Sequence, residues 1–131
     1  MVKKECQGNG LMTRLVGYEI GKSRPEAVAA RTQNPCVLDL MKYLCRSDAL
    51  FPYSGAPQGK CEQVSRPLAY EFLGMKNFDP QTLIGVATYG GCLYGNGVPR
   101  SFDQKSNAFF ERIDVDRGDS ILLLGEVDDG R

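Results

Sequence analysis

The sequence predicts an α+β fold in which about four short helices, one of them central, pack on a small antiparallel sheet. Three patterns support this prediction: four capping residues followed by proline, one amphipathic segment over residues 35–47, and two apolar segments, over residues 108–115 and 120–127. The 131 residues, 42% of them hydrophobic, match one domain with an ordinary core.

Helix starts are indicated where a capping side chain stands just before a proline, because proline fits the first helical turn. This pattern occurs at Ser23, Asn34, Ser65 and Asp79. The first helix is expected to run through the alanines of residues 27–30, with Glu26 at the spacing of a capping box. The third is expected over residues 67–73, with Leu68, Phe72 and Leu73 facing inward and Gly74 as its stop.

The segment that begins at Asp79 is ambiguous between helix and strand. Leu83, Ile84 and Ala87 have helical spacing behind a good cap. Gly85 and the β-branched residues suit a strand, because glycine costs about 1 kcal/mol inside a helix. We predict a helix.

Residues 35–47 are predicted to form the central helix of the core. At about 100° per residue, Asp39, Lys42 and Arg46 fall on one narrow stripe, and apolar side chains cover the rest. Cys36 and Cys45 lie on opposite sides of this helix, roughly 13 Å apart along its axis, which is too far for a disulfide.

Two strands are predicted near the C-terminus. Residues 108–115 and 120–127 form a hairpin in this interpretation, joined by a turn at 116–119, and residues 11–20 supply a third strand. Residues 1–9 and 128–131 are expected to be flexible tails. The turn contains Arg117-Gly118-Asp119, which matches an integrin-binding tripeptide, but a turn glycine explains the string at less cost.

The composition excludes several kinds of chemistry. Histidine is absent, which removes Ser-His-Asp and Cys-His catalysis and His-ligated zinc. No CxxC pair and no phosphate-binding lysine motif occurs, so we expect no metal and no cofactor. An enzyme is therefore less expected than a binding protein, and a carboxylate-based hydrolase is the form that an enzyme would take.

Charge is distributed unevenly along a chain whose net charge is zero. Residues 1–70 carry ten basic and six acidic side chains, and residues 71–131 carry six and ten, giving +4 and −4. No dense basic footprint indicates nucleic-acid binding. The longest apolar runs are too short to cross a bilayer, so no membrane span is expected.

The five cysteines are more than ordinary cytosolic proteins use. We expect two disulfides among Cys36, Cys45, Cys61 and Cys92, with Cys45 to Cys61 as one pair and Cys6 as the spare thiol. A secreted or periplasmic location follows from this expectation, with the signal peptide not present in the sequence. The alternative is a cytoplasmic protein with reduced thiols.

The function that fits these features is the binding or inhibition of another macromolecule, with a protein as the expected partner, by an effector, immunity or inhibitor protein. Phe51, Tyr53 and Tyr94 are the aromatic residues in Gly/Pro-rich loops, and we predict that they contact the partner. The alternatives are an intracellular or viral accessory protein and a carboxylate-based hydrolase. The oligomeric state is left open.

Overall fold

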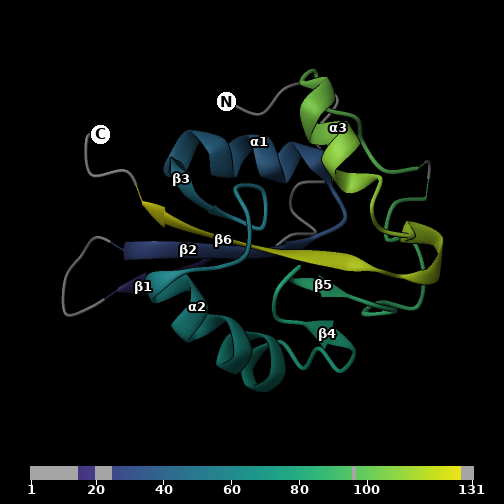
Figure 1. Cartoon of the computed structure of the whole chain (residues 1–131). Helices are drawn as coiled ribbons and strands as arrows, with labels where there is room; N and C mark the ends of the chain where they lie inside the picture. Colours follow the sequence, from purple (N-terminus) through teal and green to yellow (C-terminus); the bar gives the residue numbers. More distant parts are fainter. Residues whose placement is uncertain (1–14, 20–24, 96, 128–131) are drawn as a thin grey trace.

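The computed structural model describes residues 15–19, 25–95 and 97–127, and this part of the chain has an α+β fold (Figure 1). Six strands form one antiparallel sheet: β1 (Leu15–Glu19), β2 (Pro25–Thr32), β3 (Cys45–Phe51), β4 (Phe78–Asp79), β5 (Ile84–Gly85) and β6 (Ser120–Val127). The helical elements are α1 (Pro35–Leu44), α2 (Gly59–Arg66), the π-helix η3 (Pro67–Phe72), α3 (Gln104–Phe110) and the 3-10 turn η4 (Val115–Arg117). The predicted α+β class with an antiparallel sheet is confirmed, whereas the predicted set of about four helices differs from the one observed.

The C-terminal strand β6 is the centre of the sheet. It pairs with β2 on one side and with both β3 and β5 on the other, in the order β1-β2-β6-β5-β4 with β3 off this path. Ile121 and Leu123 enter one core, and Leu122 and Leu124 enter another. A strand buried on both faces has a continuous apolar sequence, which explains the run of four apolar residues.

Helices cover both faces of the sheet (Figure 1). On one face, α1 and α3 contribute Leu38, Met41 and Phe109 to the first core. On the opposite face, α2 and η3 contribute Cys61 and Leu68 to the second core. The predicted central helix therefore forms an outer layer of the molecule.

The helix predicted after Ser23 is wrong, because Pro25–Thr32 is strand β2. Its alanines favour a helix locally, but β2 is paired along its length with β1 and β6. Ala29 and Ala30, each 1% exposed, lie on opposite faces of the sheet in the second and first cores. Pairing on both edges and packing on both faces therefore override the local preference.

The predicted hairpin of residues 108–115 and 120–127 is half right. The second segment is β6, but Gln104–Phe110 is helix α3. Asp103 caps this helix, since its carboxylate accepts a hydrogen bond from the Lys105 backbone N–H at 2.9 Å. Phe109 and Phe110 then pack on the sheet, and β6 takes its partners from elsewhere in the chain.

The helix predicted after Asp79 is also wrong, because the segment forms a tight hairpin of β4 and β5. The Asp79 carbonyl accepts from Leu83 N at 2.7 Å, which closes one turn. Leu83 then adopts a left-handed conformation with φ 59°, so the turn cannot continue as a helix. Gly85 follows in the sheet, where a Cβ would collide with the side chains of Met75 and Thr88.

The predicted helix over 35–47 is confirmed in part. Asn34 caps α1 as expected, with its side chain accepting from Cys36 N at 2.8 Å. The helix ends at Leu44, however, and Cys45–Phe51 is strand β3. The Gly/Pro-rich loop that follows therefore begins only after Phe51.

The third predicted helix is longer than expected, since it begins as α2 at Gly59 and continues through η3. Gly74 ends it with φ 67°, as predicted. Leu68 faces inward, but Phe72 is 61% exposed. Strand β1 lies within the predicted strand 11–20, and the predicted tails 1–9 and 128–131 lie outside the described residues.

Candidate functional site

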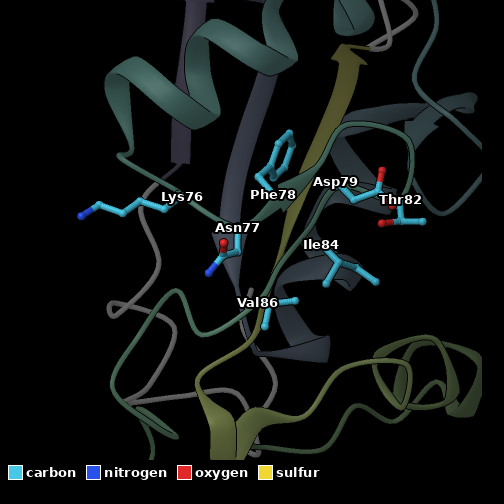
Figure 2. Close-up of a pocket in the computed structure, with 7 residues that line it drawn as sticks. All are labelled: Lys76, Asn77, Phe78, Asp79, Thr82, Ile84 and Val86. Carbon is cyan, nitrogen blue, oxygen red and sulfur yellow. The ribbon is translucent and has the colours of Figure 1, made fainter.

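An open groove lies on the β4–β5 hairpin at the end of the sheet (Figure 2). We call it the hairpin groove. Its volume is about 500 Å³, and it is lined by Lys76, Asn77, Phe78, Asp79, Thr82, Ile84 and Val86. It is a shallow concave surface among the described residues, wide open to solvent.

The pairing of the two strands explains which side chains share the groove. Val86 N donates to the Asn77 carbonyl at 2.8 Å, and Asp79 lies opposite Ile84. Side chains alternate along a strand, so Asn77, Asp79, Ile84 and Val86 share one face of the hairpin. Ile84 also touches the first core, whereas Phe78 enters the second core from the other face.

The groove has an apolar floor and a polar rim. Ile84 is half-buried and Val86 is 37% exposed. Figure 2 shows Asp79 and Thr82 at one end and Lys76 extending away at the other, with Asn77, Ile84 and Val86 between them. No ion pair to Asp79 or Lys76 is formed by the described residues.

The floor is bracketed by two residues in an unfavourable backbone conformation. Leu83 has φ 59° and Ala87 has φ 53°, and both are non-glycine residues in the left-handed region. Leu83 is held by Leu122 N, which donates to its carbonyl at 2.8 Å. Ala87 is held by Asp119, whose Oδ1 accepts from Ala87 N at 2.9 Å.

Asp119 is a buried carboxylate that supports this arrangement. Its oxygens accept from Arg117 Nε at 2.9 Å and Nη2 at 2.6 Å, and from Asp114 N at 3.0 Å. The hydrogen bonds from Arg117 lower the pKa of Asp119 to about 2, against an opposing effect of burial. The Arg117 side chain is 53% exposed, but that of Asp119 is 1% exposed and paired with Arg117, so the carboxylate is not displayed as an integrin-binding tripeptide would require.

The outer edge of β4 is covered by η3. Tyr70 donates from its hydroxyl to the Phe78 carbonyl at 3.1 Å, and the two rings meet edge to face with centroids 5.6 Å apart. This contact satisfies a backbone group that an added strand would otherwise use. The groove face of the hairpin, and not its edge, is therefore the open surface.

The structure places the three predicted contact aromatics inside the protein or close to it. Phe51 and Tyr94 are 4% and 5% exposed, so the expectation that they lie exposed in loops is wrong for both. Tyr53 is half-buried and packs edge to face on Phe109, with centroids 5.3 Å apart. A contact role for these three residues stays a prediction, and none of them lines the hairpin groove.

The exposed aromatics are different residues. Tyr43, Phe72 and Phe102 are 65%, 61% and 61% exposed, and Tyr70 is 44% exposed. The sequence interpretation placed Tyr43 and Phe72 on apolar helix faces. The exposure of Tyr43 could have been predicted from the width of the apolar face of α1. Almost the whole surface of this helix is apolar, although only one side can pack on the sheet.

The cysteines do not form the predicted pair. Cys45, Cys61 and Cys92 carry thiols, so the bridge expected between Cys45 and Cys61 is absent. Burial raises the pKa of Cys61 to about 12, which keeps this thiol protonated. Cys36 is buried at the start of α1, with Sγ 3.7 Å from the Arg100 carbonyl oxygen. Cys6 lies outside the described residues.

A second polar cluster joins α1 to α3. Ser106 donates to Asp39 at 2.6 Å, Ser101 also donates to Asp39, and Lys42 Nζ lies 2.8 Å from Ser106 Oγ and 2.9 Å from Asp103. A serine beside a lysine is an arrangement used for nucleophilic catalysis.

Two properties of this cluster oppose that role. Desolvation lowers the pKa of Lys42, but hydrogen bonds to Asp103 and Tyr53 outweigh it, so the pKa is raised and the ammonium cannot act as a base. Ser106 is fully buried, with 0% exposure. We therefore interpret the cluster as a structural link between the two helices.

No group of three or more Cys, Asp or Glu side chains in the described part of the chain could hold a metal ion. None of the helices in the described ranges is long and apolar enough to cross a membrane.

Comparison with known proteins found no relative of this chain. No family model, no curated protein and no solved structure matches it.

Proposed function

We propose that this protein binds another protein and that the hairpin groove is the contact site. The observation that carries the proposal is the backbone strain at Leu83 and Ala87, on either side of the groove floor. A left-handed non-glycine residue costs about 1–3 kcal/mol, and such residues gather at binding and catalytic sites, where the strain holds a required geometry.

The composition of the groove also supports binding. Ile84 and Val86 give an apolar centre, and Asn77, Asp79 and Thr82 give a polar rim, which is the usual pattern of a protein interface. A groove of about 500 Å³ suits one or two side chains of a partner rather than a whole domain. The proposal includes partners that the protein inhibits, as effectors, immunity proteins and inhibitors do.

The thiols bear on where this binding takes place. An exported protein held by two disulfides was the first expectation, but Cys45, Cys61 and Cys92 carry thiols. Buried thiols are ordinary in proteins from reducing compartments. Cys36, however, is disulfide-bonded, which fits an oxidising compartment. We propose a secreted or periplasmic setting, with an intracellular one as the alternative.

The test is affinity capture from the source cells with three forms of the protein: wild type, Val86→Lys and Phe72→Lys. Val86→Lys places a charge on the groove floor. Phe72→Lys is the matched control, since it changes an exposed apolar residue on η3 in the same way. We expect a partner that wild type and Phe72→Lys recover equally and that Val86→Lys recovers about ten-fold less, as the loss of one contact of about 1.4 kcal/mol predicts.

Thermal unfolding of the three forms shows that each is folded before capture. Equal recovery of the partner by Val86→Lys would remove the groove from the interface. Loss of recovery with Phe72→Lys alone would move the interface to η3.

A further inference from the structure

The shape and charge of the hairpin groove indicate which part of a partner enters it. Resting on the function proposed above, we infer that the occupant is an arginine or lysine side chain from an exposed segment of the partner protein. Its methylene groups lie on Ile84 and Val86, and its cationic head meets Asp79.

The floor of the groove suits the stem of a basic side chain. Ile84 lies in β5 and Val86 directly follows this strand, so their side chains are neighbours on one face of the hairpin. Both are partly accessible to solvent. The stems of lysine and arginine are aliphatic and are commonly buried along apolar surface while the charged head stays hydrated. An open groove permits this arrangement, since the head does not have to leave water.

The end of the groove supplies the counter-charge. Asp79 Oδ1 accepts a hydrogen bond from Gln81 N at 2.9 Å, which fixes the carboxylate in a turn of the Asx type. No described residue forms an ion pair with this carboxylate. The Thr82 hydroxyl lines the same end, so the groove there presents oxygen acceptors to an ammonium or guanidinium group (Figure 2).

The lining of the groove contains two charged side chains, the carboxylate of Asp79 and the ammonium group of Lys76. The one groove cation, Lys76, extends away from the floor (Figure 2). An acidic residue in this groove would therefore meet the Asp79 carboxylate, whereas a basic one is attracted.

The test uses a display library of random linear peptides as the probe and the whole protein as the target. Peptides are selected on wild type and then measured against Asp79→Asn, Asp79→Lys, Val86→Lys and Glu62→Gln. Asparagine can make the same turn through its Oδ1, so Asp79→Asn removes only the charge. Glu62→Gln is the matched control, because it removes the same charge from an exposed position on α2.

We expect the selected peptides to share an arginine or lysine. Their affinity should fall about ten-fold with Asp79→Asn and with Val86→Lys, stay unchanged with Glu62→Gln, and weaken as salt is added. A new selection on Asp79→Lys should yield acidic residues in place of the basic one.

Two results would overturn the inference, and they differ in what they say of the groove. Peptides that depend on Val86 but share no basic residue, and bind Asp79→Asn as well as wild type, would leave the groove as a binding site with a different occupant. Failure to enrich any peptide that depends on Val86 would show that a linear basic segment is not sufficient, and the capture experiment would then decide the proposed function by itself.

Discussion

At the scale of single residues, Ala87 offers the clearest test of the strain argument. Its side chain is exposed and its φ is 53°, so replacement by glycine removes strain without removing packing. We expect Ala87→Gly to raise the free energy of unfolding by about 1 kcal/mol. Urea denaturation of the variant and wild type measures this difference.

The same substitution elsewhere provides the control. Ala108 is exposed within helix α3, and Ala108→Gly should lower the free energy of unfolding by about 1 kcal/mol. A loss of stability in both variants would mean that Ala87 is not strained. If Ala87→Gly stabilises the protein but weakens partner capture, the strain serves binding.

Asp119 makes the protein sensitive to acid. Its pKa is about 2 when folded, compared with an ordinary value near 4, so its stabilising effect is complete above about pH 4 and is lost as the pH falls towards 2. The difference corresponds to about 2 kcal/mol. In a plot of the urea midpoint against pH, Asp119→Asn should therefore remove most of the fall on the acid side. Asp116→Asn, a change at an exposed neighbour, should keep the acid loss.

At the scale of elements, the two faces of α1 should respond differently to truncation. Leu38 is 0% exposed in the first core, and Leu38→Ala should cost about 2–5 kcal/mol because it leaves a cavity. Leu40 is 39% exposed, and Leu40→Ala should cost less than about 1 kcal/mol. Thermal or urea unfolding distinguishes the two. Equal losses would contradict the orientation of α1.

The elements that could be predicted from the sequence were those whose local signals agree with their packing. The start of α1 was predicted from Asn34 and the proline after it, the end of the helix before residue 75 from Gly74, and β6 from its continuous apolar run. Pro25–Thr32 could not be predicted as a strand, because its alanines are held in β2 by partners far away in the sequence. The helix of residues 104–110 was hidden for a related reason: its phenylalanines suit a strand equally well.

The candidate site was mostly beyond sequence reasoning. Aromatic residues in Gly/Pro-rich loops were expected to be exposed, but Phe51 ends a strand and enters the second core. The groove depends on a turn that reverses the chain at Leu83, a residue with no intrinsic preference for a left-handed conformation. Gly85 and the β-branched residues after Asp79 were the signals that pointed to a strand there.

At the scale of the whole molecule, burial should decide which thiols react. Cys61 is 0% exposed with a pKa of about 12, whereas Cys92 is half-buried. We expect iodoacetamide to label Cys92 in the folded protein and Cys61 only after unfolding. Peptide mapping by mass spectrometry without reductant measures both. Rapid labelling of Cys61 in native protein would contradict the packing of the second core.

The central place of β6 has a consequence for how the protein is made in the cell. Residues 120–127 pair with β2, β3 and β5, yet they are the last of all these strands to be synthesised. While the ribosome is still adding them, β1 can pair with β2 and β4 with β5, but β2, β3 and β5 have no strand between them. The sheet and its two cores therefore cannot be completed until residue 127 has left the ribosomal tunnel, and until then the apolar side chains of both cores stay accessible.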